Sequence, residues 1–379
     1  MSTRETARSV ARDALVRIET DDAYANLVVP AMLERSNLDE RDRRFVTELV
    51  YGSTRMRRAL DANLAPHLQR DVEPVVRAIL RLGTYQMRYA GVALHAAVSA
   101  TVDVAPKRAQ GFVNAILRRV SEAGEPAHWD AATRLSYPDW IVDQLRTDLG
   151  VPDAMAALEA MNNPPRPHTR DDGYVQDPAS GWVAGLVDAE PGQRVLDVCA
   201  APGGKATALG HLVGDAGVIV AADVRPNRAA LIALNATRTE TTSAVRPVVA
   251  DGTRPPLRPD AFDRVLVDAP CSGLGVLHRR PDARWRVRAE DVTELAKTSK
   301  ALLGATAPLV APGGLLVFSV CTITSAETSD VAGWAAAQLR GFTPLPSPGG
   351  PWRPHGHGAL LLPQTAGTDG MFIARFRRS

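Results

Sequence analysis

The chain has 379 residues, of which 45% are hydrophobic and 23% are charged, and its formal net charge at pH 7 is +2. These values are typical of a folded protein of about two domains, and three cysteines are too few for a disulfide framework and fit a reducing compartment. No apolar stretch approaches the roughly 20 residues that cross a bilayer, and the first residues lack the apolar core of a secretion signal, so we expect a cytoplasmic protein without membrane contact.

Residues 1–125 are predicted to form an all-α domain. Apolar residues recur at helical spacing, for example over 43–64, 72–87 and 96–120, and no run alternates as a strand would. Residues 51–120 hold eleven Arg or Lys against four Asp or Glu. Such an excess indicates either a solvated helix face or a surface that follows nucleic-acid phosphates, and composition leaves both open.

Residues 126–172 are predicted to be a linker with short helices. The segment LSYPDWIVDQLRTDLG fits one or two short helices. The Pro-rich stretch NNPPRPHTRDD, residues 162–172, cannot continue a helix and is typical of a connection.

Residues 173–379 are predicted to form an α/β domain. Short runs rich in Val (RVLDVC, VIVAADV, SAVRPVVAD, DRVLVDAP and GLLVFSVC) alternate with helical stretches. Strands buried on both faces of a parallel sheet have this composition. The sequence therefore predicts a doubly wound, Rossmann-like sheet preceded by an all-α helical domain.

The first predicted strand leads into a loop that can bind a ligand. Its small residues and two glycines let a ligand approach the backbone at a helix N-terminus. The loop is neither a GxGxxG motif nor a P-loop, so a ligand with a pyrophosphate or triphosphate is not expected. Acids end the first four predicted strands, where a nucleoside ribose binds in doubly wound sheets. Together these features favour a nucleoside with a cationic tail, such as S-adenosylmethionine. The residues predicted to contact this cofactor are Cys199, Ala200, Ala201, Pro202, Gly203, Gly204, Lys205, Asp223, Arg228, Asp251 and Asp268.

Several motifs together resemble those of the RNA cytosine-5 methyltransferases. They are VCAAPGGKAT, VADGT, DAPCSGLG, RRPDARWR, FSVCT and GTDGMFIARF. The closest resemblance is to the bacterial Sun/Fmu type, which modifies 16S ribosomal RNA. Residues 96–120 are similar to the most recognisable segment of NusB, an RNA-binding helical bundle. The resemblance spans nearly the whole chain. It implies a NusB-like domain, a class I methyltransferase domain that uses S-adenosylmethionine, ribosomal RNA of the small subunit as partner, and a monomer.

Methylation at C5 of cytosine needs a thiolate that adds to C6, an acid at N3 and a group that assists elimination. Cys271 and Cys321 follow the fourth and fifth predicted strands, and Asp268 lies on the same rim. The resemblance implies that Cys321 attacks, that Cys271 assists product release and that Asp268 holds N3. In the DNA cytosine-5 enzymes the thiol at the position of Cys271 attacks instead. We expect no metal, because the histidines of HGHG lack further ligands at suitable spacing.

Some residues depart from the family pattern. The segment HTRDDG at 168–173 stands where the family usually carries a small α+β subdomain, and Val320 and Thr328 replace the usual Thr and Asn. We expect the core chemistry to survive these changes. The basic segment 279–288, which contains five arginines and Trp285, is predicted to clamp RNA phosphates around a splayed-out base.

Two other hypotheses stay open at this point. The same catalytic core could act on tRNA, another RNA or DNA. The chain could also be a non-catalytic, RNA-binding ribosome assembly factor, although the presence of Asp268, Cys271 and Cys321 speaks against that.

Overall fold

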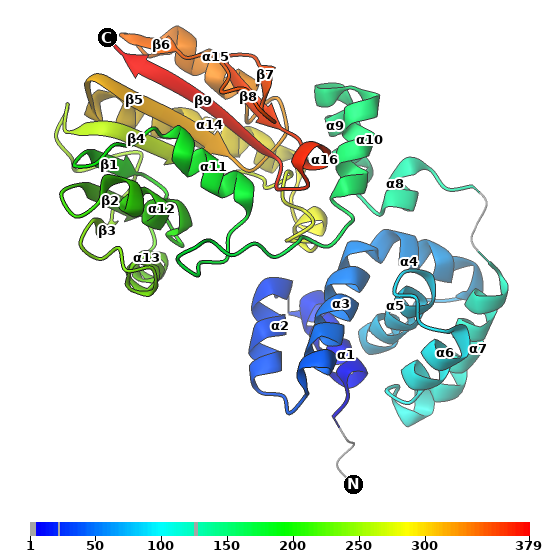
Figure 1. The fold of residues 1–379 in the computed structure, drawn as a ribbon. Coiled ribbons are helices and arrows are strands. Elements are labelled where there is room, and N and C mark those ends of the chain that lie inside the picture. The colour runs from blue at the N-terminus through cyan, green and yellow to red at the C-terminus, as the bar shows by residue number, and fades with distance from the viewer. Residues whose placement is uncertain (1–4, 22, 125–127) are drawn as a thin grey trace. The chain divides into compact units, whose positions relative to one another are not determined.

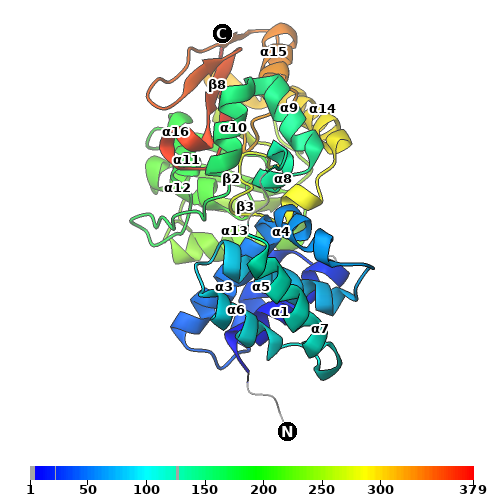
Figure 2. The ribbon, with the colours of Figure 1, turned by 90° about the vertical axis from the view of Figure 1, so that its right-hand side faces the viewer.

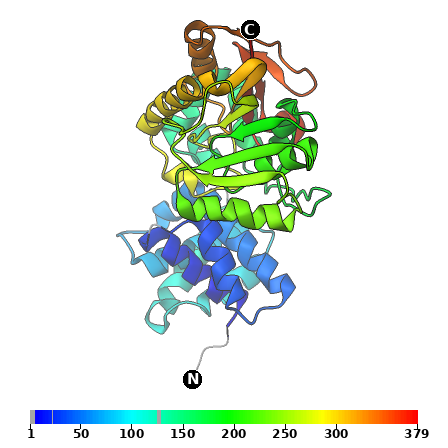
Figure 3. The same cartoon turned by 90° about the vertical axis from the view of Figure 1, so that its left-hand side faces the viewer.

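The computed structural model describes residues 5–21, 23–124 and 128–379. The chain forms two compact units (Figures 1, 2 and 3). The helical unit comprises Met1–Asp143 and Leu277–Arg286, and the sheet unit comprises Gln144–Val276 and Val287–Ser379. The domain limits expected from the sequence stay a prediction. The segment Leu277–Arg286, from the middle of the α/β region, packs within the helical unit.

The helical unit is an all-α bundle, as predicted. Its helices are α1 (Ala7–Thr20), α2 (Ala25–Glu34), α3 (Glu40–Arg55), α4 (Arg57–Leu64), α5 (Pro74–Arg88), α6 (Leu94–Val102), α7 (Gln110–Glu122) and α8 (Ala131–Leu135), with single turns η1 (Ala65–His67), η2 (Lys107–Ala109) and η3 (Ala283–Trp285). The side chain of Asp39 accepts a hydrogen bond from the Asp42 N–H at 2.8 Å and so caps the start of α3. The run with helical spacing over 43–64 forms two helices, α3 and α4, which meet at Met56.

The core of this unit lies where α1, α3 and α5 pack together. Val46, Leu49 and Leu82 are fully buried there. A Cβ atom at Gly52 would lie 2.0 Å from the ring of Tyr85, so α3 and α5 can approach this closely only with glycine at that position.

The sheet unit contains the remaining elements. Its strands are β1 (Arg194–Asp197), β2 (Val218–Asp223), β3 (Val245–Val249), β4 (Phe262–Asp268), β5 (Val310–Val320), β6 (Phe342–Pro344), β7 (Arg353–His355), β8 (Gly358–Leu361) and β9 (Met371–Arg378). Its helices are α9 (Asp139–Leu149, which the unit boundary divides), α10 (Val151–Ala160), α11 (Pro178–Leu186), α12 (Gly204–Val213), α13 (Pro226–Arg238), α14 (Ala289–Thr306), α15 (Ser329–Gln338), α16 (Pro363–Ala366) and the turn η4 (Ala307–Leu309).

The strands form one sheet in the order β3-β2-β1-β4-β5-β9-β8-β7, with β6 also paired to β9. The first five strands are parallel, which confirms the doubly wound prediction, and β6 to β9 add an antiparallel edge that the sequence analysis did not anticipate. Helix α12 packs with α11 and α13, and α14 packs with α15. Right-handed crossovers put these two groups on opposite faces of the sheet (Figure 1).

This topology gathers the carboxyl ends of the parallel strands at one edge. Ligands bind outside that edge in doubly wound sheets. Asp197, Asp223 and Asp268 are the last residues of β1, β2 and β4, and Cys321 follows the last residue of β5. Among the described helices, none combines the length and the apolar character needed to cross a membrane.

Candidate active site

The two thiols expected in the active site lie side by side. Cys271 is in the loop after β4, and Cys321 follows β5, the neighbouring parallel strand. Their sulfur atoms are 3.2 Å apart, within hydrogen-bonding distance for sulfur. The structure therefore brings together two residues that are fifty positions apart in the sequence.

A carboxylate and an ammonium group accompany the thiols. The Nζ atom of Lys205, in the first turn of α12, donates a hydrogen bond to Oδ2 of Asp268 at 2.7 Å. Their side chains are only 11% and 26% exposed. Burial acts to lower the pKa of Lys205, but the charge and hydrogen bond of Asp268 outweigh it and raise the pKa, so the lysine stays cationic.

The two thiols differ in how readily they ionise. The pKa of Cys321 is lowered chiefly by the hydrogen bond from the Cys271 thiol. Burial and the charge of Asp268 act to raise this pKa, and the charge of Lys205 acts to lower it. The pKa of Cys271 is raised, because that thiol donates to Cys321 and is itself buried. These opposite directions favour ionisation at Cys321 over Cys271, and the thiolate is the nucleophilic form of cysteine.

Glu327 joins the two loops that carry the thiols. Its Oε1 atom accepts a hydrogen bond from the Ser272 N–H at 2.7 Å, and Oε2 accepts from the hydroxyl groups of Ser272, Thr322 and Thr324 at 2.5, 3.1 and 2.9 Å. Glu327 is 1% exposed. The sequence analysis assigned no role to Glu327. The only available signal was an acid shortly after a Cys-Thr pair, because its partners across the two loops become visible only in the fold.

Hydrogen bonds connect the loop after β1 to the neighbouring strand β2 and helix α13. The Ala200 N–H donates to Ala222 O at 2.8 Å, and Arg228 Nη2 donates to Ala201 O at 2.7 Å. The Ala201–Pro202 peptide bond is cis. Gly203 has a φ of 108°, and a Cβ atom there would lie 3.1 Å from Ile232 Cα, so only glycine fits.

Buried acids next to this loop fit a cationic nucleoside. Asp197 is 1% exposed, and among the described residues neither of its carboxylate oxygens has a hydrogen-bond partner. Burial, with the nearby charge of Asp268, raises the pKa of Asp197 to about 8. A cation bound here would compensate the carboxylate. Asp223 accepts from the Arg225 N–H at 3.0 Å, and its other oxygen lies 3.7 Å from Arg228 Nε.

Two predicted cofactor residues have local environments of a different kind. Burial raises the pKa of Cys199 to about 12, which makes it a poor nucleophile. Asp251 is exposed, and one of its oxygens accepts hydrogen bonds from the Thr253 N–H and hydroxyl at 2.9 and 2.7 Å. These bonds lower the pKa of Asp251 and are typical of a turn.

Comparison with known proteins identifies the family. The family described as 16S rRNA methyltransferase RsmB/F matches residues 184–377, and the NusB family matches residues 5–122. The ribosomal RNA small subunit methyltransferase B of Thermus thermophilus is 34% identical, with 98% of each chain covered. The chain belongs to the RsmB/F family. Its class I methyltransferase fold, NusB-like domain and use of S-adenosylmethionine are therefore confirmed.

Further similarities agree with this. The Mycobacterium tuberculosis protein Rv1407 is 36% identical, covering 98% of this chain and 96% of its own. The crystal structure of PH0851 superposes with a TM-score of 0.81 at 20% identity over all of both chains, which supports the fold alone.

The segment 168–173 contacts the cofactor loop of this RsmB/F chain. Arg170 Nη1 donates to Gly204 O at 2.6 Å and to Gln176 Oε1 at 3.0 Å. The Arg170 guanidinium also pairs with Asp172 and lies 5.1 Å from the ring centroid of Tyr174. The sequence analysis missed Arg170, because nothing in a Pro-rich linker indicates a contact with a distant helix start.

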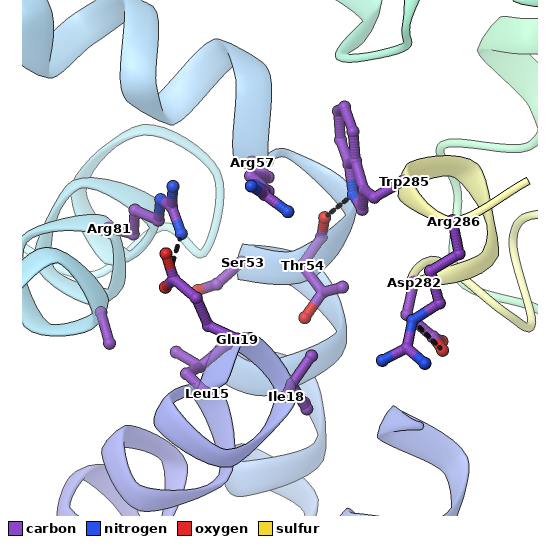
Figure 4. A pocket seen from close by; sticks show the side chains of 11 residues that line it. Leu15, Ile18, Glu19, Ser53, Thr54, Arg57, Arg81, Asp282, Trp285 and Arg286 are labelled. Carbon is purple, nitrogen blue, oxygen red and sulfur yellow. Dashed lines mark hydrogen bonds and ion pairs between the residues drawn. The ribbon is translucent and has the colours of Figure 1, made fainter. Parts of the chain in front are cut away.

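The prediction that the whole basic segment 279–288 clamps RNA phosphates is wrong for its central residues. Arg284 is fully buried in the helical unit, where Nη1 donates to Arg55 O at 3.2 Å and to Ser136 O at 3.1 Å. Its guanidinium lies 3.9 Å from the ring centroid of Tyr137. Trp285 Nε1 donates to Thr54 O at 2.7 Å (Figure 4). These side chains hold the segment in the bundle.

Many of the basic residues counted between 51 and 120 also have internal partners. Arg81 binds Asp61 and Glu19, Arg58 binds Asp139 at 2.9 Å, and Arg55 is 3% exposed. A phosphate-binding face on this unit is consequently smaller than the sequence count indicates.

Proposed function

We propose that this RsmB/F chain transfers a methyl group from S-adenosylmethionine to C5 of a cytosine in 16S ribosomal RNA. The observation that carries the proposal is the 3.2 Å contact between Cys271 and Cys321, beside the ion pair of Lys205 with Asp268. The name of the Thermus thermophilus relative supports ribosomal RNA of the small subunit as the substrate.

Cys321 is the nucleophile in this proposal. Its thiolate adds to C6, and the displaced electron pair makes C5 nucleophilic. The Asp268–Lys205 pair supplies the hydrogen bond and proton needed at N3. Bound S-adenosylmethionine supplies the methyl group, and Asp197, Asp223 and the 199–204 loop are the residues that would hold it.

Cys271 assists the last step. After a base has removed the C5 proton, the C6–S bond breaks and Cys321 leaves as a thiolate. The raised pKa of Cys271 keeps that thiol protonated, so it can stabilise the departing sulfur over 3.2 Å.

The roles of the thiols are tested with RNA of the small subunit, S-adenosylmethionine and purified variants. Cys271→Ala is expected to accumulate a covalent protein–RNA adduct that is retained on a denaturing gel, and Cys321→Ala is expected to form none. The opposite pattern would move the nucleophile to Cys271, the arrangement of the DNA enzymes.

The substrate is tested by offering labelled S-adenosylmethionine with small-subunit RNA, tRNA or duplex DNA. We expect label in small-subunit RNA, at C5 of cytosine by bisulfite sequencing. Label only in tRNA would reject the proposed substrate, and RNA binding without any transfer would favour an assembly factor.

A further inference from the structure

A cavity of about 150 Å³ lies within the helical unit. Residues of α1, α3, α4 and α5 line it together with the end of the Leu277–Arg286 segment (Figure 4). That segment follows the Cys271 loop directly in the chain, but the proposed chemistry makes no use of the cavity.

Three of the residues that line the cavity each carry a buried polar atom without a hydrogen-bond partner among the described residues. These atoms are Ser53 Oγ, Thr54 Oγ1 and Asp282 Oδ1, on residues that are 1%, 6% and 3% exposed. Unpaired polar atoms are costly to bury, and native proteins leave few of them. Their clustering around one cavity indicates a ligand that offers both donors and acceptors.

The size and the walls of the cavity select a flat, single-ring ligand. A cavity of about 150 Å³ is large enough for benzene. Leu15, Ile18 and Ala78 provide apolar walls, and the Trp285 side chain provides an aromatic one. A pyrimidine ring is close to benzene in size and matches this volume, and the larger fused rings of a purine match it less well.

The charges favour a neutral ring attached to an anionic group. Arg81 is held by Asp61 and Glu19 at 2.7 to 2.9 Å, and Arg286 donates to Ala23 O at 2.5 Å. Arg57, in contrast, is exposed and has no hydrogen-bond or ion-pair partner in the described part of the chain. Its guanidinium lies 5.6 Å from the Trp285 ring centroid.

We propose that this cavity binds an unpaired pyrimidine nucleotide of the RNA, at a site separate from the cytosine that is methylated. Asp282 accepts a hydrogen bond from an N–H group of the base edge, Ser53 and Thr54 pair with its remaining polar atoms, and Arg57 contacts the phosphate. The inference rests on the proposed function, because the RNA substrate supplies this nucleotide.

The test uses the full chain and ligand-detected NMR titrations with cytidine, uridine and adenosine 5′-monophosphates and with inorganic phosphate. We expect the pyrimidine nucleotides to bind in preference to the other two. Thr54→Val and Arg57→Ala should each weaken that binding about tenfold, the effect of losing one good hydrogen bond or charge contact. Thr47→Val and Arg44→Ala, at exposed positions of α3, are the matched controls and should leave it unchanged.

The following outcomes would overturn the proposal. Equal binding of phosphate or of the adenosine nucleotide would indicate a general anion site, and no binding at all would indicate a cavity filled only by water. If Cys321→Ala abolishes nucleotide binding and Thr54→Val does not, the nucleotide binds at the catalytic centre and not in the cavity.

Methylation kinetics separate this proposal from the proposed function. In Thr54→Val the KM for small-subunit RNA should rise several-fold while kcat stays unchanged. Loss of nucleotide binding with an unchanged KM would reject a role for the cavity in holding RNA. If the wild-type protein binds pyrimidine nucleotides but transfers no methyl group, the nucleotide site in the cavity would be supported and the proposed function would be rejected.

Discussion

Lys205 influences the reactivity of the Cys321 sulfur through its charge. Replacing Lys205 with Met removes a cation that stabilises the thiolate, so the pKa of Cys321 should rise. Activity depends on the thiolate and increases as pH rises through that pKa. The rising limb of the kcat/KM profile should therefore move to higher pH. If it moves by about one pH unit, the rate at pH 7 should fall about tenfold. A pH–rate series of methyl transfer measures this.

Lys297 offers a control, because it forms an exposed ion pair with Glu294 at 2.8 Å. Lys297→Met should leave the profile unchanged, and Lys205→Arg should restore part of the lost activity at pH 7. An unchanged rising limb in Lys205→Met would show that another group sets the ionisation of Cys321.

The buried carboxyl group of Asp197 predicts a pH-dependent stability. Its pKa in the fold, about 8, lies above the ordinary value of 3.8, so the native state holds a proton that the unfolded state has lost between these limits. The free energy of unfolding should fall as pH rises through that window. The Asp197→Asn protein lacks this pH-dependent decrease in the free energy of unfolding. Measured by urea unfolding without cofactor, its free energy of unfolding relative to that of the wild type should therefore increase from pH 5 to pH 9.

Asp251 is the matched control for Asp197, because hydrogen bonds lower its pKa and its contribution has the opposite sign. Asp251→Asn should show no gain between pH 5 and pH 9. A constant difference between Asp197→Asn and the wild type across this range would contradict the burial of a protonated Asp197.

At the level of elements, Glu327 connects the loop after β4 to the loop after β5. Glu327→Ala leaves one N–H and three buried hydroxyl groups without their acceptor, and we expect it to lower the free energy of unfolding by about 3 kcal/mol. Because the loops carry the thiols, alkylation of Cys321 by iodoacetamide should also change in rate. Unfolding in urea and mass spectrometry of the alkylated peptide measure the two effects.

Glu327→Gln keeps an acceptor for the Ser272 N–H and should therefore lie between Glu327→Ala and the wild type. Glu294→Ala, at an exposed position, is the control. Normal alkylation in a destabilised Glu327→Ala protein would limit the role of Glu327 to folding.

The elements that could be predicted are those with a strong local pattern. The Val-rich runs indicated the parallel strands, and the motif order indicated which strand ends carry Cys271 and Cys321. In the antiparallel edge, β6 and β7 have three residues each and β8 has four, so these strands carry little periodic signal. The RNA contact of Arg284 was predicted from a basic segment with an aromatic residue, a pattern usually exposed to solvent. The partners that stabilise its burial, among them the carbonyl groups of Arg55 and Ser136 and the Tyr137 hydroxyl, are visible only in the fold.

At the scale of the whole molecule, the buried Arg284 connects distant parts of the chain. Arg284→Met should leave the carbonyl groups of Arg55 and Ser136 without a donor and lower the free energy of unfolding of the helical unit by about 3 kcal/mol. Calorimetry of the full chain should show a lower Tm for that unit. Arg280→Met, at an exposed position in the same segment, should have little effect, and equal Tm values for the two variants would contradict the structural role of Arg284.

The segment Leu277–Arg286 also bears on how the protein is made. When residue 143 has left the ribosome, most of the helical unit has been synthesised. The last part of that unit, Leu277–Arg286, follows only after residue 276. At about 5 to 20 residues per second, that piece emerges roughly 7 to 30 s later. During this interval the surface around Thr54 and Tyr137 of the nascent bundle is uncovered, because Arg284 and Trp285 have not yet been synthesised. A chaperone or a neighbouring nascent chain then has access to that surface.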